Sequence, residues 1–262
     1  MPFSASDTRD VSASLGRNRL IDMMPEALAK EIEAAGEMVD LPAGTVLFSS
    51  GEDIATTLFP FAPTMVSLVV DVDDRRRVEV ATIGQEGAIG GIVSCGDLPA
   101  YTQGEVQVAG TGLRVPMDVI ERLKRDDLFM RDIFCRYADT LLAQVMQSVA
   151  CNAFHPIEAR AARWLLTAQD RSGDELALTQ SALAALLGVQ RTSVNAVARQ
   201  LQDEGLIRYR RGIVSVIDRD ELKQRACECY ARVEAHFDRV LGDEDSDWIK
   251  ACGANGEPRS DG

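Results

Sequence analysis

The chain has 262 residues, enough for two globular domains, and 46% of them are hydrophobic while 26% are charged. It has no run of about 18 apolar residues, and its polar N-terminus lacks the apolar core of a secretory signal, which argues against a membrane partner. The net charge of −13 argues against a protein that coats nucleic acid without specificity. We expect a cytoplasmic protein.

Residues 1–19 are expected to form a polar, mobile arm, and residues 20–117 an antiparallel β-roll. A short helix is expected within 20–36, with Pro25 in its first turn. Alternating apolar residues and glycine turns then predict the many short strands of a jelly roll. The strand patterns cover residues 37–41, 46–48, 58–61, 65–72, 78–83, 89–93, 104–109 and 112–115.

Residues 118–152 are expected to be helical and to provide a dimer contact. At 1.5 Å per residue, the segment 126–152 would be about 40 Å long. Its apolar residues cover too wide an arc for a lone surface helix, so one face could pack on the roll and another on a partner helix. The alternative is that both faces are buried within one chain. The expected dimer residues are Met130, Phe134, Tyr137, Ala138, Leu141, Val145 and Val149.

The stretch 178–217 carries the clearest functional pattern and lies in an expected domain at 153–225. Thr179 suits a helix N-cap, and Gly188 can supply the positive φ that ends this helix and reverses the chain. A second helix follows, and its apolar residues Val194, Val197, Ala198 and Leu201 share one face. Residues 207–209 and 213–217 then alternate as strands around a turn at 210–212. The pattern predicts a helix-turn-helix followed by a two-stranded wing.

Short polar and basic side chains occupy the opposite face of the second helix. This face suits the major groove of DNA, and arginines at the wing tip would neutralise phosphates. Residues 156–225 contain 11 Lys plus Arg against 9 Asp plus Glu, so the rest of the chain carries −15. We therefore predict that a limited basic patch binds double-stranded DNA. The candidate DNA-binding residues are Thr179, Gln190, Arg191, Thr192, Ser193, Asn195, Ala196, Arg199, Arg208, Arg210 and Arg211.

Residues 226–262 are expected to continue a helix as far as Leu241 and then form an acidic tail. The six cysteines contain no C-x2-C pair, and His155 and His236 are the only histidines. Zinc or iron–sulfur sites need clustered thiolates, so we expect reduced cysteines, no metal site and no cofactor. His155 precedes Pro156 and is expected to mark a structural boundary. We see no nucleophile–base pair and no P-loop, and expect no enzyme activity.

Two runs, LTQSALAALLGVQRTSVNAVARQLQDEGLI and YRRGIVSVID, resemble the winged helix-turn-helix of the Crp/Fnr family of bacterial transcription regulators. The similarity extends to the segments CNAFHPIEARAARWLL, CECYARVEAHF, LPAGTVLFSSGE and IGQEGAIGG, and so covers most of the chain, residues 20–237. It implies an α+β fold with an N-terminal antiparallel jelly roll of the cyclic-nucleotide-binding type, a long dimerisation helix and a C-terminal winged domain. It also implies a homodimer on a palindromic DNA site, with RNA polymerase as a further candidate partner.

The resemblance assigns base reading to Arg191, Thr192 and Ala196, and phosphate contacts to Gln190, Ser193 and Arg199. Arg191 keeps the family's arginine, which can pair bidentately with guanine. Thr192 stands where many members have glutamate, and Ala196 where they have arginine. We therefore expect a palindrome that differs from the best-known family operator.

The glycine-rich segment 84–91 lies where the family's cyclic-nucleotide binders hold a sugar-phosphate. The candidate effector-pocket residues are Gly84, Glu86, Gly87 and Ala88. There is no Lys or Arg between Arg77 and Arg114, so a ring phosphate would lack its charged partner. We expect that cAMP is not the effector, and the sequence names no other. The alternative function is a ligand-sensing module whose winged domain contacts proteins instead of DNA, which the basic wing disfavours.

Overall fold

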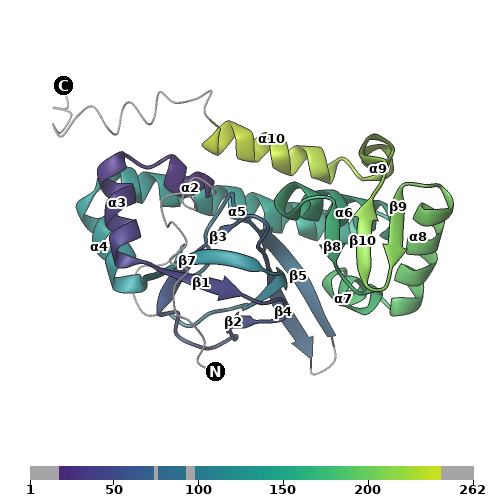
Figure 1. The fold of residues 1–262 in the computed structure, drawn as a ribbon, viewed down its shortest axis with the longest axis horizontal. Coiled ribbons are helices and arrows are strands. Elements are labelled where there is room, and N and C mark those ends of the chain that lie inside the picture. Colours follow the sequence, from purple (N-terminus) through teal and green to yellow (C-terminus); the bar gives the residue numbers. More distant parts are fainter. Residues whose placement is uncertain (1–17, 74–75, 93–97, 243–262) are drawn as a thin grey trace, which may run out of the picture.

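The computed structural model describes residues 18–73, 76–92 and 98–242. Most of the expected N-terminal arm and the whole acidic tail lie outside these residues. A β-roll and a smaller winged domain lie side by side, and the long helix α5 runs along the roll and leads into the winged domain (Figure 1). None of the helices described is both long and apolar enough to cross a membrane.

The roll consists of two antiparallel sheets behind a short helical entry. Asn18 caps helix α2 (Arg19–Asp22) by accepting hydrogen bonds from the backbone of Leu20 and Ile21, and α3 (Glu26–Ala35) follows. One sheet has the order β1-β7-β3 and the other β2-β6-β4-β5. The strands are β1 (Glu37–Leu41), β2 (Val46–Phe48), β3 (Thr56–Phe61), β4 (Met65–Asp73), β5 (Arg76–Ile83), β6 (Gln103–Val108) and β7 (Gly110–Pro116). This confirms the predicted antiparallel sheets, and all but one of the expected strand patterns correspond to a strand.

The pattern at 89–93 was wrong as a strand. Ile89 forms only an isolated bridge with Leu58, and Val93 lies outside the described residues. Gly90 and Gly91 follow with φ of 93° and 59°, and such left-handed backbone cannot continue a strand. The segment therefore turns immediately after Ile89.

Helix α4 (Met117–Asp126) leads into α5 (Leu128–Phe154), whose 27 residues match the expected long helix. Asp127 caps α5 by accepting a hydrogen bond from the backbone of Met130. The roll covers the buried face of α5. For example, the rings of Phe134 and Phe59 meet edge to face with their centroids 6.5 Å apart, and the Tyr137 hydroxyl donates to the Ala88 carbonyl at 3.0 Å.

This packing corrects part of the expected dimer face. Met130, Phe134 and Tyr137 are at most 2% exposed inside the chain's own core and are not available to a partner. The large apolar residues that α5 leaves exposed include only one of the predicted set. They are Leu128, Leu142, Met146, Val149 and Phe154. Of the predicted set, Val149 is exposed, whereas Ala138, Leu141 and Val145 are half-buried.

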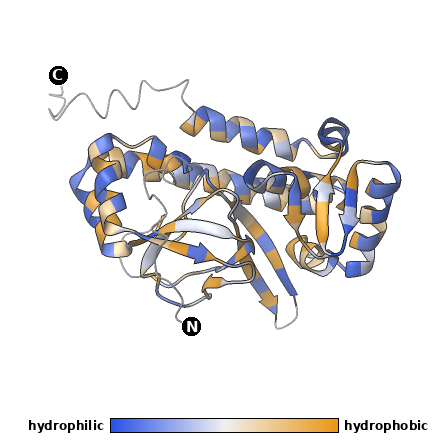
Figure 2. Cartoon of the chain, viewed as in Figure 1, coloured by the Kyte–Doolittle hydropathy of each residue, from blue (hydrophilic) through white to orange (hydrophobic). Residues whose placement is uncertain are grey.

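The winged domain begins with α6 (Ile157–Ser172) and contains the predicted helix pair, α7 (Gln180–Leu186) and α8 (Arg191–Asp203). Its sheet has three strands in the order β8-β10-β9, not the expected two. The additional strand β8 (Glu175–Ala177) pairs with β10 (Ile213–Val216), which also pairs with β9 (Ile207–Arg210). Figure 2 shows the apolar β10 in the middle of the domain and hydrophilic residues along α8. Two C-terminal helices, α9 (Arg219–Arg225) and α10 (Cys229–Leu241), replace the single helix expected.

Polar contacts join the winged domain to its own roll. The Arg171 Nε on α6 donates to the Glu86 carboxylate at 2.7 Å, and the two side chains are only 8% and 13% exposed. The Trp164 Nε1 donates at 2.8 Å to Glu79 on β5. Helix α10 runs back along α5, and the Nε2 of His236 on α10 lies 2.9 Å from the Oδ2 of Asp139 on α5. The two domains therefore share a buried, hydrogen-bonded contact.

Candidate nucleic-acid interface

The helix pair has the turn that the sequence predicted. The Thr179 hydroxyl caps α7 by accepting a hydrogen bond from the Ala182 backbone at 3.1 Å. Gly188 has a φ of 64° and ends the first helix. A methyl group on Gly188 would lie 3.2 Å from Val78 of the roll, so glycine suits both the backbone conformation and the close approach.

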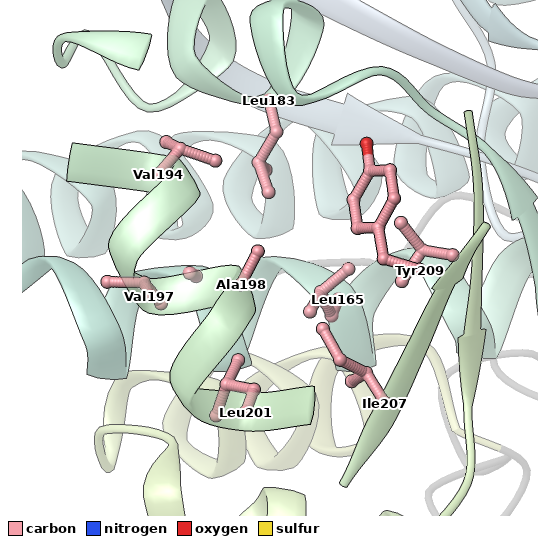
Figure 3. A pocket seen from close by; sticks show the side chains of 10 residues that line it. Leu165, Leu183, Val194, Val197, Ala198, Leu201, Ile207 and Tyr209 are labelled. Carbon is pink, nitrogen blue, oxygen red and sulfur yellow. The ribbon is translucent and has the colours of Figure 1, made fainter. Parts of the chain in front are cut away.

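One face of α8 fixes the helix to the domain. Val194, Ala198 and Leu201 are at most 3% exposed, and they point toward Leu183 of α7 and Ile207 of the wing (Figure 3). The space left among these side chains is a cavity of only about 10 Å³, about the least that can hold a single water molecule. This dense packing holds the opposite face of α8 in a fixed orientation.

The opposite face of α8 carries four of the six predicted contact residues that lie within this helix. Arg191, Thr192, Ala196 and Arg199 are all exposed, and Gln190 is exposed just before the helix. Gln190 makes no side-chain cap, which leaves the first backbone N–H groups of α8 for an anion such as phosphate. Arg199 lies 4.0 Å from Asp203 in an exposed ion pair, which competes only weakly with a phosphate.

Two predicted residues lie at the edge of this face. Ser193 and Asn195 are half-buried. The Asn195 Oδ1 is buried and has no hydrogen-bond partner among the described residues. Asn195 follows the buried Val194 directly, which explains why its side chain is turned partly inward. A contact between Asn195 and a base would therefore require its amide to rotate outward.

The wing presents a row of arginines beside the helix pair. Arg208, Arg210 and Arg211 are exposed, and within the described chain none of them has an ion-pair partner. Arg211 and Gly212 form the turn with φ of 51° and 80°, the positive values that a type I′ hairpin requires. The Gly212 carbonyl accepts a hydrogen bond from the Leu178 backbone at 2.8 Å, so the tip is fixed beside the start of α7.

The local charge favours a polyanion. Residues 179–213 contain five Arg and two acidic residues, whereas the whole chain carries −13. Tyr209 anchors β9 between the arginines: its backbone N–H donates to Gln202 at 2.9 Å, and its hydroxyl donates to the Leu178 carbonyl. Burial raises the pKa of Tyr209 to about 12, so this anchor stays neutral at physiological pH.

The predicted effector segment is closed by other parts of the chain. The Glu86 carboxylate accepts hydrogen bonds from the Gly84 backbone and from Arg171, so a cation from α6 occupies the place beside it. A methyl group on Gly87 would lie 2.2 Å from the Tyr137 hydroxyl, and Ala88 is fully buried. The cavity beside Glu86 has a volume of about 10 Å³. Residues 84–88 therefore pack the roll against α5 and α6, and the cavity beside Glu86 has no room for a nucleotide in this arrangement.

Sequence reasoning missed one convergence of reactive groups. Cys151, His155, Cys227 and Cys229 meet at the end of α5, with their sulfur and nitrogen atoms all within 4.8 Å of one another. The signal was present as a C-x3-H spacing at a helix end and a C-x-C pair. The two pairs are separated by the entire winged domain, so their proximity does not follow from the sequence.

The comparisons with known proteins agree with this architecture. Residues 159–225 match the family described as the Crp-like helix-turn-helix domain. No curated protein matches the chain. The solved structure of FixK2 from Bradyrhizobium japonicum superposes with a TM-score of 0.62 at 14% identity, covering 73% of this chain and 98% of FixK2.

Two further structures are similar at comparable identity. A transcriptional regulator of the Crp/Fnr family from Eubacterium rectale has a TM-score of 0.59 at 19% identity, with 78% of this chain and 96% of the relative covered. A Crp/Fnr-family regulator from Thermus thermophilus has a TM-score of 0.58 at 20% identity, with coverages of 72% and 98%. The chain therefore has the fold of these Crp/Fnr-family transcription regulators, and its residues 159–225 match a Crp-like helix-turn-helix domain.

Proposed function

We propose that this chain regulates transcription by binding a palindromic DNA site as a homodimer, without requiring cAMP. The observation that carries the proposal is the continuous exposed surface formed by the outer face of α8 and the arginine-bearing wing. Arg191 and Thr192 at the start of α8 would enter the major groove, while Arg208, Arg210 and Arg211 would contact phosphates. We expect this activity in the cytoplasm, with RNA polymerase as the further candidate partner.

The exposed apolar side of α5 supports the homodimer. Cys135, Leu142 and Val149 are exposed and repeat at intervals of seven residues, and Met146 adds a fourth position on the same side. Leu142, Met146 and Val149 are 51%, 61% and 67% exposed in the single chain, which is unusual for such side chains on a packed helix. Two copies of α5 pairing along this stripe would cover it in the manner of a coiled coil. The half-buried Ala138 and Val145, which belong to the dimer residues expected from sequence, lie beside this stripe.

The environment of Glu86 supports independence from cAMP. A cyclic nucleotide phosphate needs a nearby cation, and here Arg171 lies against Glu86 instead. An added phosphate would compete with a carboxylate for this single guanidinium. We infer that any effector binds elsewhere or that the protein acts without one.

Selection from a random pool of DNA duplexes, followed by fluorescence anisotropy on the enriched sequences, tests the proposal. We expect an inverted repeat whose half-sites are centred about 10 base pairs apart or a multiple of that spacing, because a two-fold dimer presents two α8 helices to one side of the duplex. Affinity should fall steeply with salt. Addition of cAMP should leave affinity unchanged. Failure to enrich any sequence at low salt would contradict DNA binding and favour the alternative, a winged domain that contacts proteins.

A further inference from the structure

Four potential metal ligands meet where α5 ends and α10 begins. Cys151 lies in the last turn of α5 and His155 is its C-cap, so they share one side of the helix end. Cys229 is the first residue of α10, and Cys227 lies two residues earlier. Their four ligand atoms lie within 4.8 Å of one another, although the two pairs are separated by the whole winged domain.

The distances between the donor atoms fit a single tetrahedral ion. The sulfur atoms of Cys151 and Cys227 are 3.5 Å apart, and the Cys229 sulfur is 3.4 Å from the His155 Nδ1. Bonds of 2.3 Å to sulfur and 2.0–2.1 Å to nitrogen at tetrahedral angles place two sulfurs about 3.8 Å apart and a sulfur and a nitrogen about 3.5 Å apart. In a [2Fe–2S] cluster two ligands bind each iron, and in a [4Fe–4S] cluster one ligand binds each iron. Ligand atoms on different irons then lie farther apart than the 4.8 Å that spans this whole set.

The surroundings orient the donors. With its Nδ1 facing Cys229, His155 places its Nε2 3.4 Å from a Glu228 carboxylate oxygen, an arrangement that fixes the tautomer of a metal-binding histidine. The Gln147 side-chain amide donates to the Cys229 sulfur at 3.0 Å. Cys151 and Cys229 are fully buried, and Cys227 is 8% exposed. The site is thus enclosed and offers four protein ligands, as structural zinc sites do.

The nearby charges match those of a zinc–thiolate centre. Three thiolates and a neutral histidine around Zn²⁺ carry a net charge of −1. Arg163 on α6 interacts electrostatically with Cys151, and its Nε is buried without a hydrogen-bond partner among the described residues. Arg160 interacts with both Cys151 and Cys227. These two guanidinium groups would offset the excess negative charge in a buried place.

We propose that Cys151, His155, Cys227 and Cys229 bind one Zn²⁺ ion as a structural site. The ion would tie the end of α5, which precedes the winged domain, to the start of α10, which follows it. It would join Cys151 to Cys227, which lie 76 positions apart in the sequence, and so close a loop around the DNA-binding domain. The proposal differs from the expectation from sequence that the chain has no metal site.

The competing interpretation is a redox pair. Loss of two electrons and two protons from Cys151 and Cys227 to a disulfide-forming oxidant would join their sulfurs, which would have to approach from 3.5 Å to about 2.05 Å. That bond would leave Cys229 and His155 without a shared role, whereas a metal ion uses all four groups. We therefore favour the metal and treat the disulfide as an outcome of the experiment.

Metal analysis of the full-length protein, purified with reductant and without added metal, is the first test. We expect one zinc per chain. After removal of metal with a chelator under reducing conditions, titration with Co²⁺ should saturate at one equivalent and give the intense visible absorption of tetrahedral, thiolate-bound cobalt. Zn²⁺ should then displace it. A reduced protein that takes up no stoichiometric metal, or that yields only a Cys151–Cys227 disulfide in air, would overturn the proposal.

Variants identify the ligands. Cys229→Ser should lose the tetrahedral cobalt spectrum and weaken zinc binding by more than 10-fold, whereas His236→Gln, at a histidine outside the cluster, should bind zinc as the wild type does. Glu228→Gln should weaken zinc binding about 10-fold, the lower end of the usual range for a group that orients a ligand. Equal effects of His236→Gln and Cys229→Ser would exclude this ligand set. If Cys229→Ser does not fold, the wild-type cobalt titration still decides, and no readout depends on DNA binding.

Discussion

At the scale of single residues, the proposed DNA contacts predict separable roles for two arginines. Arg191 begins α8, where a guanidinium could pair with a guanine edge, whereas Arg210 ends β9 at the wing, where we propose that it contacts phosphates. Arg191→Ala should cost about 1–3 kcal/mol on the selected site and relax one base position. Arg210→Ala should weaken binding to all sequences alike. Anisotropy with specific and random duplexes measures both effects, and equal losses of both variants on both duplexes would contradict the assignment.

Glu79 gives the contact between the domains a pH dependence. Burial raises its pKa above the ordinary 4.5, although hydrogen bonds from Ser67, Thr82 and Trp164 and the charge of Arg163 oppose the shift. The folded protein therefore holds this proton more tightly than the unfolded chain does. The resulting stability is fully present below pH 4.5 and is lost as the pH rises through the raised pKa.

Glu79→Gln tests this dependence, because the amide oxygen can still accept from Trp164 and the residue no longer titrates. Unfolding free energies of wild type and variant, measured from pH 4.5 to neutral, should show a shallower fall for Glu79→Gln. Glu175→Gln, at an exposed glutamate on β8, should keep the wild-type slope. Parallel pH profiles for Glu79→Gln and the wild type would refute the role of this carboxyl group.

At the scale of elements, the outward stripe of α5 is the part of the dimer proposal that can be tested alone. Leu142 is 51% exposed in one chain and would be buried twice in a symmetric pair. Full burial of a leucine contributes about 1.5–3 kcal/mol, and about half of that remains for a half-exposed side chain, so Leu142→Asp should weaken the dimer by at least about 10-fold. Sedimentation equilibrium measures the change. Tyr101→Asp, at an 83% exposed aromatic residue on the roll, should leave the dimer intact. A wild-type protein that is monomeric at micromolar concentration would exclude the stripe as an interface.

The same elements show what the sequence can and cannot predict. The helix-turn-helix was predictable because a cap at Thr179, a glycine at Gly188 and an apolar stripe on α8 are all local signals. The extra strand β8 was not, because its three residues lie between helices α6 and α7 and are defined only by pairing with β10. For α5, apolar residues on more than one side predicted more than one contact, but not which side meets the roll. The Cys and His cluster depends on long-range folding alone.

At the scale of the whole molecule, the Arg171–Glu86 pair joins the winged domain to the roll. Both side chains are largely buried, so removal of one partner leaves the other without compensation. Arg171→Met should lower the free energy of unfolding by about 3–5 kcal/mol, as for other broken buried pairs. The double variant Glu86→Gln, Arg171→Met should regain a good part of the loss, because no unpaired charge remains. Urea unfolding of the wild type, Arg171→Met, Glu86→Gln and the double variant completes the cycle, and additive losses would show that the two groups do not interact.

The left-handed backbone of Arg211 implies that this residue lowers thermal stability while it raises affinity for DNA. A non-glycine residue with a φ of 51° destabilises the fold by about 1 kcal/mol. Asparagine adopts this conformation more readily, so it would remove most of that cost. Arg211→Asn should therefore melt at a higher temperature but bind a DNA duplex more weakly. Its plot of log binding constant against log salt concentration should be shallower by about two released ions per dimer. Calorimetry would then show a higher melting temperature, and anisotropy a lower affinity for DNA. If Arg211→Asn raised or preserved both the melting temperature and the affinity for DNA, the arginine at the wing tip would not strengthen DNA binding at the expense of stability.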